Sequence, residues 1–220
     1  MPLFPGRKSV SRWAIGLVGT LIFTIVIIIG IPASRHWVLS AAGWALVAED
    51  PPGKADIIVI STDSLGAGIL EASDLFHAGF ATRVAIFDRP PTKVALELTR
   101  RGAHPLNLTE FSIQQLHQLG ISEIRVIPSV VGTVDEGKVL REWCVANSIH
   151  SILFVSVPDH SRRTRRVLDR SLQQHGIQVM VRYARFSQFD PDSWWRSRGG
   201  QRVEVVELEK LLLDLVGHPF

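Results

Sequence analysis

Residues 55–60 read Ala55-Asp56-Ile57-Ile58-Val59-Ile60, a run that ends in four consecutive β-branched apolar side chains. Such a run is typical of a strand that is buried on both faces of a parallel sheet. Four similar short runs follow along the chain, at residues 83–87, 124–127, 152–155 and 179–183. The sequence therefore predicts five strands of one buried sheet.

Segments with helical periodicity lie between these strands, because their apolar residues recur at helical spacing. They are expected at residues 69–78, 93–101, 109–119, 133–147 and 161–174, with a last helix at 203–215. Alternating strands and helices predict an α/β fold. We expect a Rossmann-like, doubly wound, mainly parallel five-stranded sheet with helices on both faces, over residues 55–220.

The part of the chain before this domain combines a basic tail, residues 1–12, with a long uncharged segment, residues 13–31. About 20 apolar residues match the thickness of a bilayer core, so we expect one transmembrane helix at 13–31. A cleaved signal peptide is the alternative, but its apolar region would be shorter. Residues 32–54 are then a juxtamembrane segment and linker. The basic flank predicts a cytoplasmic N-terminus and an extracytoplasmic domain.

The charge of the chain argues against a nucleic-acid partner. The formal net charge is +3, and Arg7, Lys8 and Arg12 alone supply three positive charges, so residues 13–220 sum to zero. Nucleic-acid binding normally needs a basic surface that neutralises phosphates. The single cysteine, Cys144, allows no internal disulfide and no thiolate metal cluster.

Polar residues directly follow the predicted strands. In open parallel α/β sheets, ligands bind at the carboxyl ends of the strands. We therefore predict a ligand-binding cleft there, formed by residues of four loops: Thr62, Asp63, Ser64, Arg89, Thr133, Glu136, His160 and Arg163. No metal site is predicted, because Asp63, Asp159 and His160 lack tight ligand spacing. The pattern identifies no catalytic residue and no cofactor.

Several of these residues have both a functional and a structural interpretation. Either His160 donates a hydrogen bond or proton and Arg163 clamps a carboxylate or phosphate, or His160 caps a helix and Arg163 pairs with an acid. Thr133 and Glu136 are either structural, with Thr133 as the N-cap and Glu136 in the first turn of a helix, or functional, with Glu136 facing His160 across the cleft. Asp63 either binds a ribose hydroxyl or makes an Asx turn.

Five segments, in this order, resemble the family typified by YdcF, SanA and ElyC, which shares domain of unknown function 218. They are residues 55–59, residues 71–79 (Glu-Ala-Ser-Asp-Leu-Phe-His-Ala-Gly), Thr133 with Asp135 and Glu136, Ser156 with residues 160–163, and Trp194-Trp195 with residues 207–211. The resemblance implies a Rossmann-type fold and a bacterial inner-membrane protein with a periplasmic domain. It also implies a link to envelope integrity and peptidoglycan, and one soluble member is associated with S-adenosylmethionine.

The chain departs from that family in its loops. Ser61-Thr62-Asp63-Ser64 and Asp88-Arg89-Pro90-Pro91 replace two glycine-rich turns, Gly68 stands where an arginine is usual, and Gly132 stands where an asparagine is usual. We predict a membrane-anchored protein of envelope biogenesis or integrity, with the bilayer as partner, that binds an anionic small molecule or a lipid-linked glycan precursor. The alternatives are a non-catalytic envelope interaction module with a degraded pocket, and a nucleotide or S-adenosylmethionine binder.

Overall fold

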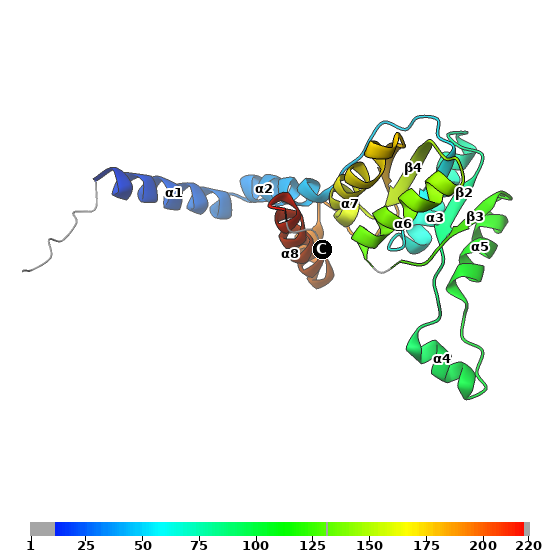
Figure 1. The fold of residues 1–220 in the computed structure, drawn as a ribbon. Coiled ribbons are helices and arrows are strands. Elements are labelled where there is room, and N and C mark those ends of the chain that lie inside the picture. The colour runs from blue at the N-terminus through cyan, green and yellow to red at the C-terminus, as the bar shows by residue number, and fades with distance from the viewer. Residues whose placement is uncertain (1–11, 131, 218–220) are drawn as a thin grey trace, which may run out of the picture.

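A computed structural model of the chain describes residues 12–130 and 132–217 (Figure 1). The predicted basic tail, apart from Arg12, lies outside these residues.

The sheet has five parallel strands, as the sequence predicts. They are β1 (Ile57–Ile60), β2 (Val84–Phe87), β3 (Ile124–Ile127), β4 (Ser151–Ser156) and β5 (Gln178–Tyr183), in the order β3-β2-β1-β4-β5. In register, Ile58 pairs with Val84 on one side and with Leu153 on the other. All four side chains of β1 are buried, because this strand is central and both faces of the sheet are covered.

Helices cover both faces of the sheet. On one face Ile58 and Ile60 of β1 pack with α3 (Leu65–His77) and α5 (Leu108–Gln118). On the other face Ile57 and Val59 pack with α6 (Thr133–Ala146) and α7 (Pro158–Leu172). The alternation along β1 thus divides the core into two layers, consistent with a Rossmann-like fold.

Helix α4 (Lys93–Arg100) stands apart from both layers, at the tip of two extended connections (Figure 1). All eight of its residues are at least partly exposed. We call residues 89–107 the α4 arm.

Residues 32–46, part of the predicted juxtamembrane segment, form α2 (Pro32–Leu46), which packs on α7 and on α8 (Arg198–Leu215). The indole of Trp194, in the short helix η2 (Trp194–Arg196), donates to the Leu39 carbonyl at 2.8 Å. The Arg162 guanidinium donates to main-chain carbonyls at the end of α2. These contacts fasten α2 to the α/β domain.

The prediction of a transmembrane helix at residues 13–31 is wrong. Helix α1 (Arg12–Gly30) occupies this segment. A membrane span needs about 20 consecutive apolar residues, and among residues 12–130 and 132–217 no helix is both long enough and apolar enough to cross a bilayer. The bilayer partner and the inner-membrane location were predicted from this helix, so both predictions are wrong as well.

Candidate functional site

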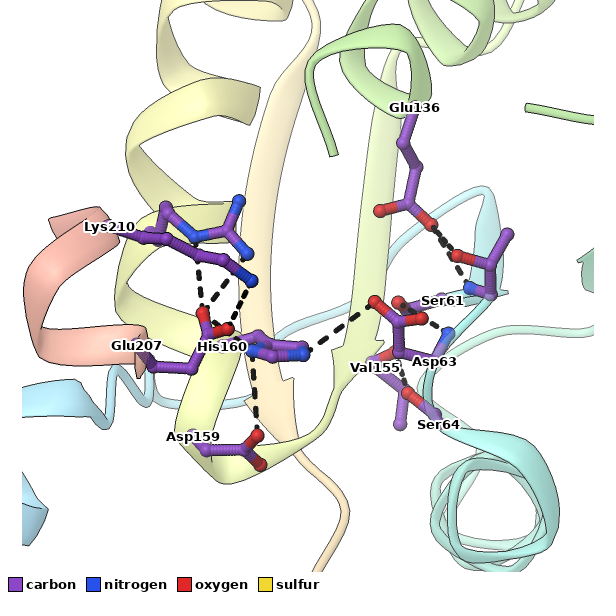
Figure 2. Close-up of polar contacts among 11 residues, drawn as sticks. Ser61, Asp63, Ser64, Glu136, Val155, Asp159, His160, Glu207 and Lys210 are labelled. Carbon is purple, nitrogen blue, oxygen red and sulfur yellow. Dashed lines mark hydrogen bonds and ion pairs between the residues drawn. The ribbon is translucent and has the colours of Figure 1, made fainter. Parts of the chain in front are cut away.

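The candidate site lies where the order of the strands reverses. The chain proceeds from β1 to β2 and β3 on one side of the sheet, and β4 and β5 lie on the other side of β1. The connections that leave β1 and β4 therefore diverge, and ligands of such sheets bind in the crevice that this divergence opens. Thr62, Asp63, Glu136 and His160 come together there, and we call them the switch-point site (Figure 2).

The loop after β1 is fastened to β4. The hydroxyl of Ser64, which is buried, donates to the carbonyl of Val155 at 3.0 Å. The amide of Asp63 donates to the Ser61 hydroxyl at 3.3 Å. Ser64 therefore holds the loop, and the Asp63 side chain, 54% exposed, remains open to a ligand.

Glu136 reaches from the first turn of α6 to the loop after β1. Its Oε1 accepts from the Thr62 amide at 3.0 Å and from the Thr62 hydroxyl at 3.4 Å. Burial raises the pKa of Glu136 to about 7, the negative charge of Asp63 acts in the same direction, and the hydrogen bonds from Thr62 oppose both. The carboxyl of Glu136 thus faces Thr62 and exchanges its proton near neutral pH.

His160, in the first turn of α7, is surrounded by carboxylates. Its Nδ1 lies 2.9 Å from Glu207 Oε2 and 3.5 Å from Asp159 Oδ2, and its Nε2 lies 3.8 Å from Asp63 Oδ2. Burial on its own lowers the pKa of His160, but the contact with Glu207 and the charges of Asp159 and Asp63 outweigh it and raise the pKa. The imidazole is therefore held toward its cationic form, with Nε2 directed to Asp63 (Figure 2).

Arg163 does not face the open part of the cleft. The side chain is buried, and its Nη2 donates to Glu207 Oε2 at 3.1 Å. Lys210 donates to Oε1 of the same carboxylate at 2.7 Å. Burial alone would raise the pKa of Glu207, but His160, Lys210 and Arg163 together lower it to about 2. Arg163 therefore pairs with an acid, which is its structural interpretation.

Thr133 and Arg89 take other positions. Thr133 is the first residue of α6, and the N-cap is Gly132, with φ of 85°. The backbone amide of Arg89 donates to the Thr109 hydroxyl at 2.8 Å. Among the described arginines that are not exposed, Arg89 is the one whose guanidinium has neither a hydrogen-bond nor an ion-pair partner.

The buried acidic face of α8 is part of the site that was not predicted from the sequence. Glu207 completes the surroundings of His160, and Glu204, one turn earlier, is fully buried. Among the described residues, neither carboxyl oxygen of Glu204 has a hydrogen-bond partner. Burial, with Asp159 nearby, raises the pKa of Glu204 to about 7. The sequence does contain a sign of this burial. Residues 204, 207 and 211 share one helix face, and the presence of Leu211 on that face indicates that the two glutamates are buried with it.

Three helices begin at the site, and in the described part of the chain none of their N-cap side chains accepts a hydrogen bond from the first turn. These N-caps are Ser64 for α3, Gly132 for α6 and Val157 for α7. By contrast, the side chains of Thr92, Asn107 and Ser197 cap α4, α5 and α8. The first backbone N–H groups of α3 and α6 therefore need another partner. In α7, Pro158 has no N–H group and the His160 amide donates to the Val157 carbonyl at 3.2 Å.

The acidic groups do not form a metal centre. Within the described ranges, no three His, Cys, Asp or Glu side chains are arranged so that they could hold a metal ion.

No family model and no curated protein matches the chain. Among solved structures, it is similar to the crystal structure of a universal stress protein in complex with cAMP, with 13% sequence identity and a TM-score of 0.39. The similarity covers 60% of this chain and 99% of that chain. A likeness this distant is no guide to function, and the resemblance to the YdcF, SanA and ElyC family stays a prediction.

Proposed function

We propose that the switch-point site binds a nucleotide-like small molecule that carries a ribose and one anionic group. The observation that carries the proposal is the position of Asp63. Its carboxylate is 54% exposed, it lies at the point where the strand order reverses, and it follows β1 directly. An exposed carboxylate accepts hydrogen bonds from hydroxyl groups such as those of a ribose. Dinucleotide-binding α/β folds also bind the ribose with an acidic residue, although theirs lies about 20 residues after the first βα turn.

The helix N-termini without side-chain caps support the second part of the proposal, the anionic group of the ligand. The N-termini of α3, α6 and α7 begin after β1, β3 and β4, at one edge of the sheet. Backbone N–H groups and the helix dipole at such an end stabilise a phosphate. At α7 the dipole is the main contribution, because Pro158 has no N–H group and the His160 amide donates to Val157. Contacts between Thr62 and Glu136 and between Asp63 and His160 bring the three ends to one place.

His160 supports the same assignment. Glu207 and Asp159 surround its Nδ1, and its Nε2 lies 3.8 Å from Asp63, which is beyond hydrogen-bond distance. A cationic imidazole in this position is available to donate from Nε2 to a phosphate or a hydroxyl between the two side chains.

The acidic groups limit the class of ligand. Asp63, Asp159 and Glu207 surround His160, so a ligand that is anionic throughout would be repelled. Arg163, on which an anion clamp would depend, is bound to Glu207. A nucleotide, or S-adenosylmethionine with its cationic sulfonium, therefore fits the site better than a lipid-linked glycan precursor.

Ligand-induced stabilisation tests the proposal. The thermal midpoint of the full chain is measured with AMP, ATP, S-adenosylmethionine, adenosine and ribose 5-phosphate. A ligand at 100 times its dissociation constant stabilises the folded state by about 2.7 kcal/mol. We expect at least one nucleotide-like ligand to raise the midpoint, and Asp63→Asn and His160→Gln to reduce the effect by about 2 kcal/mol.

Glu123→Gln is the matched control, because it removes an exposed carboxylate just before β3, at the opposite end of the strands. It should leave the ligand effect unchanged. The proposal fails if no ligand of the panel shifts the midpoint, or if the shift is the same in Asp63→Asn as in the original chain.

A further inference from the structure

A cavity lies within the α4 arm, separate from the switch-point site. Its volume is about 400 Å³, and small-molecule pockets in proteins range from about 300 to 1,000 Å³. Its lining residues come from α4 and from the two connections that join α4 to the domain. The arm therefore contains a cavity large enough to bind a small molecule.

The walls of this cavity are apolar. Pro91, Ala95, Pro105 and Leu106 line it, together with polar residues whose side chains serve the arm itself. The Thr92 hydroxyl accepts from the Ala95 amide at 3.2 Å and caps α4.

The other polar side chains in the wall are engaged in the same way. The Thr99 hydroxyl donates to the Ala95 carbonyl at 3.0 Å, and Asn107 caps α5 by accepting from the Thr109 and Glu110 amides. The exception is His104, which also lines the cavity and is exposed. The cavity thus offers few polar groups to an occupant and suits an apolar one.

Arg89 is the charged residue of the wall. It lines this cavity and also a small cavity beside Thr62 and Leu65, so it stands between the arm and the switch-point site. Its backbone is fixed by Thr109, whose hydroxyl donates to Asp88 at 2.9 Å.

The Arg89 guanidinium is half-buried and unpaired, and burial lowers its pKa, opposed by the charge of Asp63. Such a cation has lost part of its hydration without gaining a partner. An anionic group on a ligand would restore the missing partner.

We propose that the α4 arm binds an amphipathic anion, with an apolar body in the cavity and one carboxylate or phosphate on Arg89. The apolar walls match the body, and the free guanidinium matches the head group. This inference does not depend on the nucleotide-like ligand of the switch-point site, because cavity, ligand class and residues differ.

Isothermal titration of the full chain with decanoate, decyl phosphate and decanol tests the proposal. The two anions share an apolar body with decanol and differ from it in charge. We expect one or both anions to bind and decanol to bind at least tenfold more weakly. The anion that binds more tightly identifies the head group that Arg89 prefers.

Three variants locate the binding. Arg89→Met keeps an unbranched side chain and removes the charge, and should weaken anion binding at least tenfold. Ala95→Phe fills the cavity and should abolish binding. Arg125→Met, on the exposed part of β3, is the matched control and should bind as the original chain does. Circular dichroism checks that each variant is folded.

The outcomes decide the proposal. Decanol binding as tightly as the anions would overturn the role of Arg89. Anion binding that survives both Arg89→Met and Ala95→Phe would place the ligand elsewhere, for example on the exposed apolar side chains of α1, and would also overturn it. Asp63→Asn should not weaken anion binding, because it removes a negative charge that acts on Arg89, so failure here and failure of the nucleotide proposal are distinguishable.

Discussion

Nδ1 of His160 lies 2.9 Å from Oε2 of Glu207, so an ion pair joins the start of α7 to the last helix of the chain. Arg163 and Lys210 contact the same carboxylate, which is 3% exposed. The orientation of the imidazole at the switch-point site therefore depends on α8 as well as on the loops that follow the strands.

Glu207→Gln should destabilise the fold. It removes the counter-charge of His160, Arg163 and Lys210 at a buried position, and breaking a buried pair typically costs about 3–5 kcal/mol. Urea unfolding at pH 7 measures the free energy of unfolding. Glu209→Gln, at an exposed position of the same helix, should change it by less than about 0.5 kcal/mol. Equal stability of the two variants would contradict the role given to Glu207.

Glu136 should make the free energy of unfolding fall as the pH rises. Its pKa is raised from 4.5 to about 7 in the folded state, so between these values the folded chain holds a proton that the unfolded chain has lost. The stabilisation from Glu136 is thus full below pH ~4.5 and is lost as the pH rises through ~7, by about 3 kcal/mol. Urea unfolding from pH 4.5 to 8 should show this slope in the original chain and a flatter one in Glu136→Gln. An unchanged slope would show that Glu136 is not the group that titrates.

Glu204→Met should stabilise the fold. Both carboxyl oxygens of Glu204 lack a hydrogen-bond partner among the described residues, and the residue is fully buried. An apolar side chain of similar length avoids the cost of burying this group, and we expect a gain of about 1–3 kcal/mol at pH 8. Thermal and urea unfolding measure the gain, with Glu209→Met as the exposed control. A loss of stability would show that Glu204 has a partner in solution.

Gly68→Ala should destabilise the start of α3. A Cβ atom at this position would lie 2.3 Å from Cβ of Ser64 and 2.7 Å from Cγ2 of Ile60, and such overpacking costs about 1–3 kcal/mol. Gly66→Ala is the matched control, because nothing lies within 4 Å of its added Cβ. The control should be neutral or slightly stabilising, since alanine favours helix over glycine. Equal effects of the two substitutions would contradict the close packing of Gly68 on Ser64.

Much of the sheet could be predicted from the sequence, because its strands appear as short, mainly apolar runs, most of them buried; the edge strand β3 is the exception, with Arg125 and Val126 exposed. The run at residues 124–127 coincides with β3 (Ile124–Ile127), and those at 83–87 and 152–155 lie within one residue of β2 and β4. The parallel order follows from the helices between them. The long apolar segment at residues 13–31 led to a wrong prediction of a membrane span.

The site was predictable only in part. The loops that form it could be predicted, because they follow the carboxyl ends of the predicted strands. Contacts between residues distant in sequence could not be predicted. Glu207 reaches His160 through the packing of α8 on α7, which no local pattern records. The amphipathic residues 93–101 correctly predict a helix, yet they give no sign that α4 stands on an arm away from the sheet. Gly68, which departs from the family pattern, has a steric reason that depends on Ser64 and Ile60.

The most direct test of the nucleotide-like ligand is a titration of the ¹⁵N-labelled chain, followed by amide chemical shifts. If a nucleotide binds at the uncapped helix ends, the largest shifts will fall on Thr62, Gly66, Asp135 and His160, in the first turns of α3, α6 and α7 and the loop before α3. Those shifts will be absent in Asp63→Asn at the same ligand concentration. Shifts confined to other parts of the chain, or equal shifts in Asp63→Asn, would contradict the proposed site.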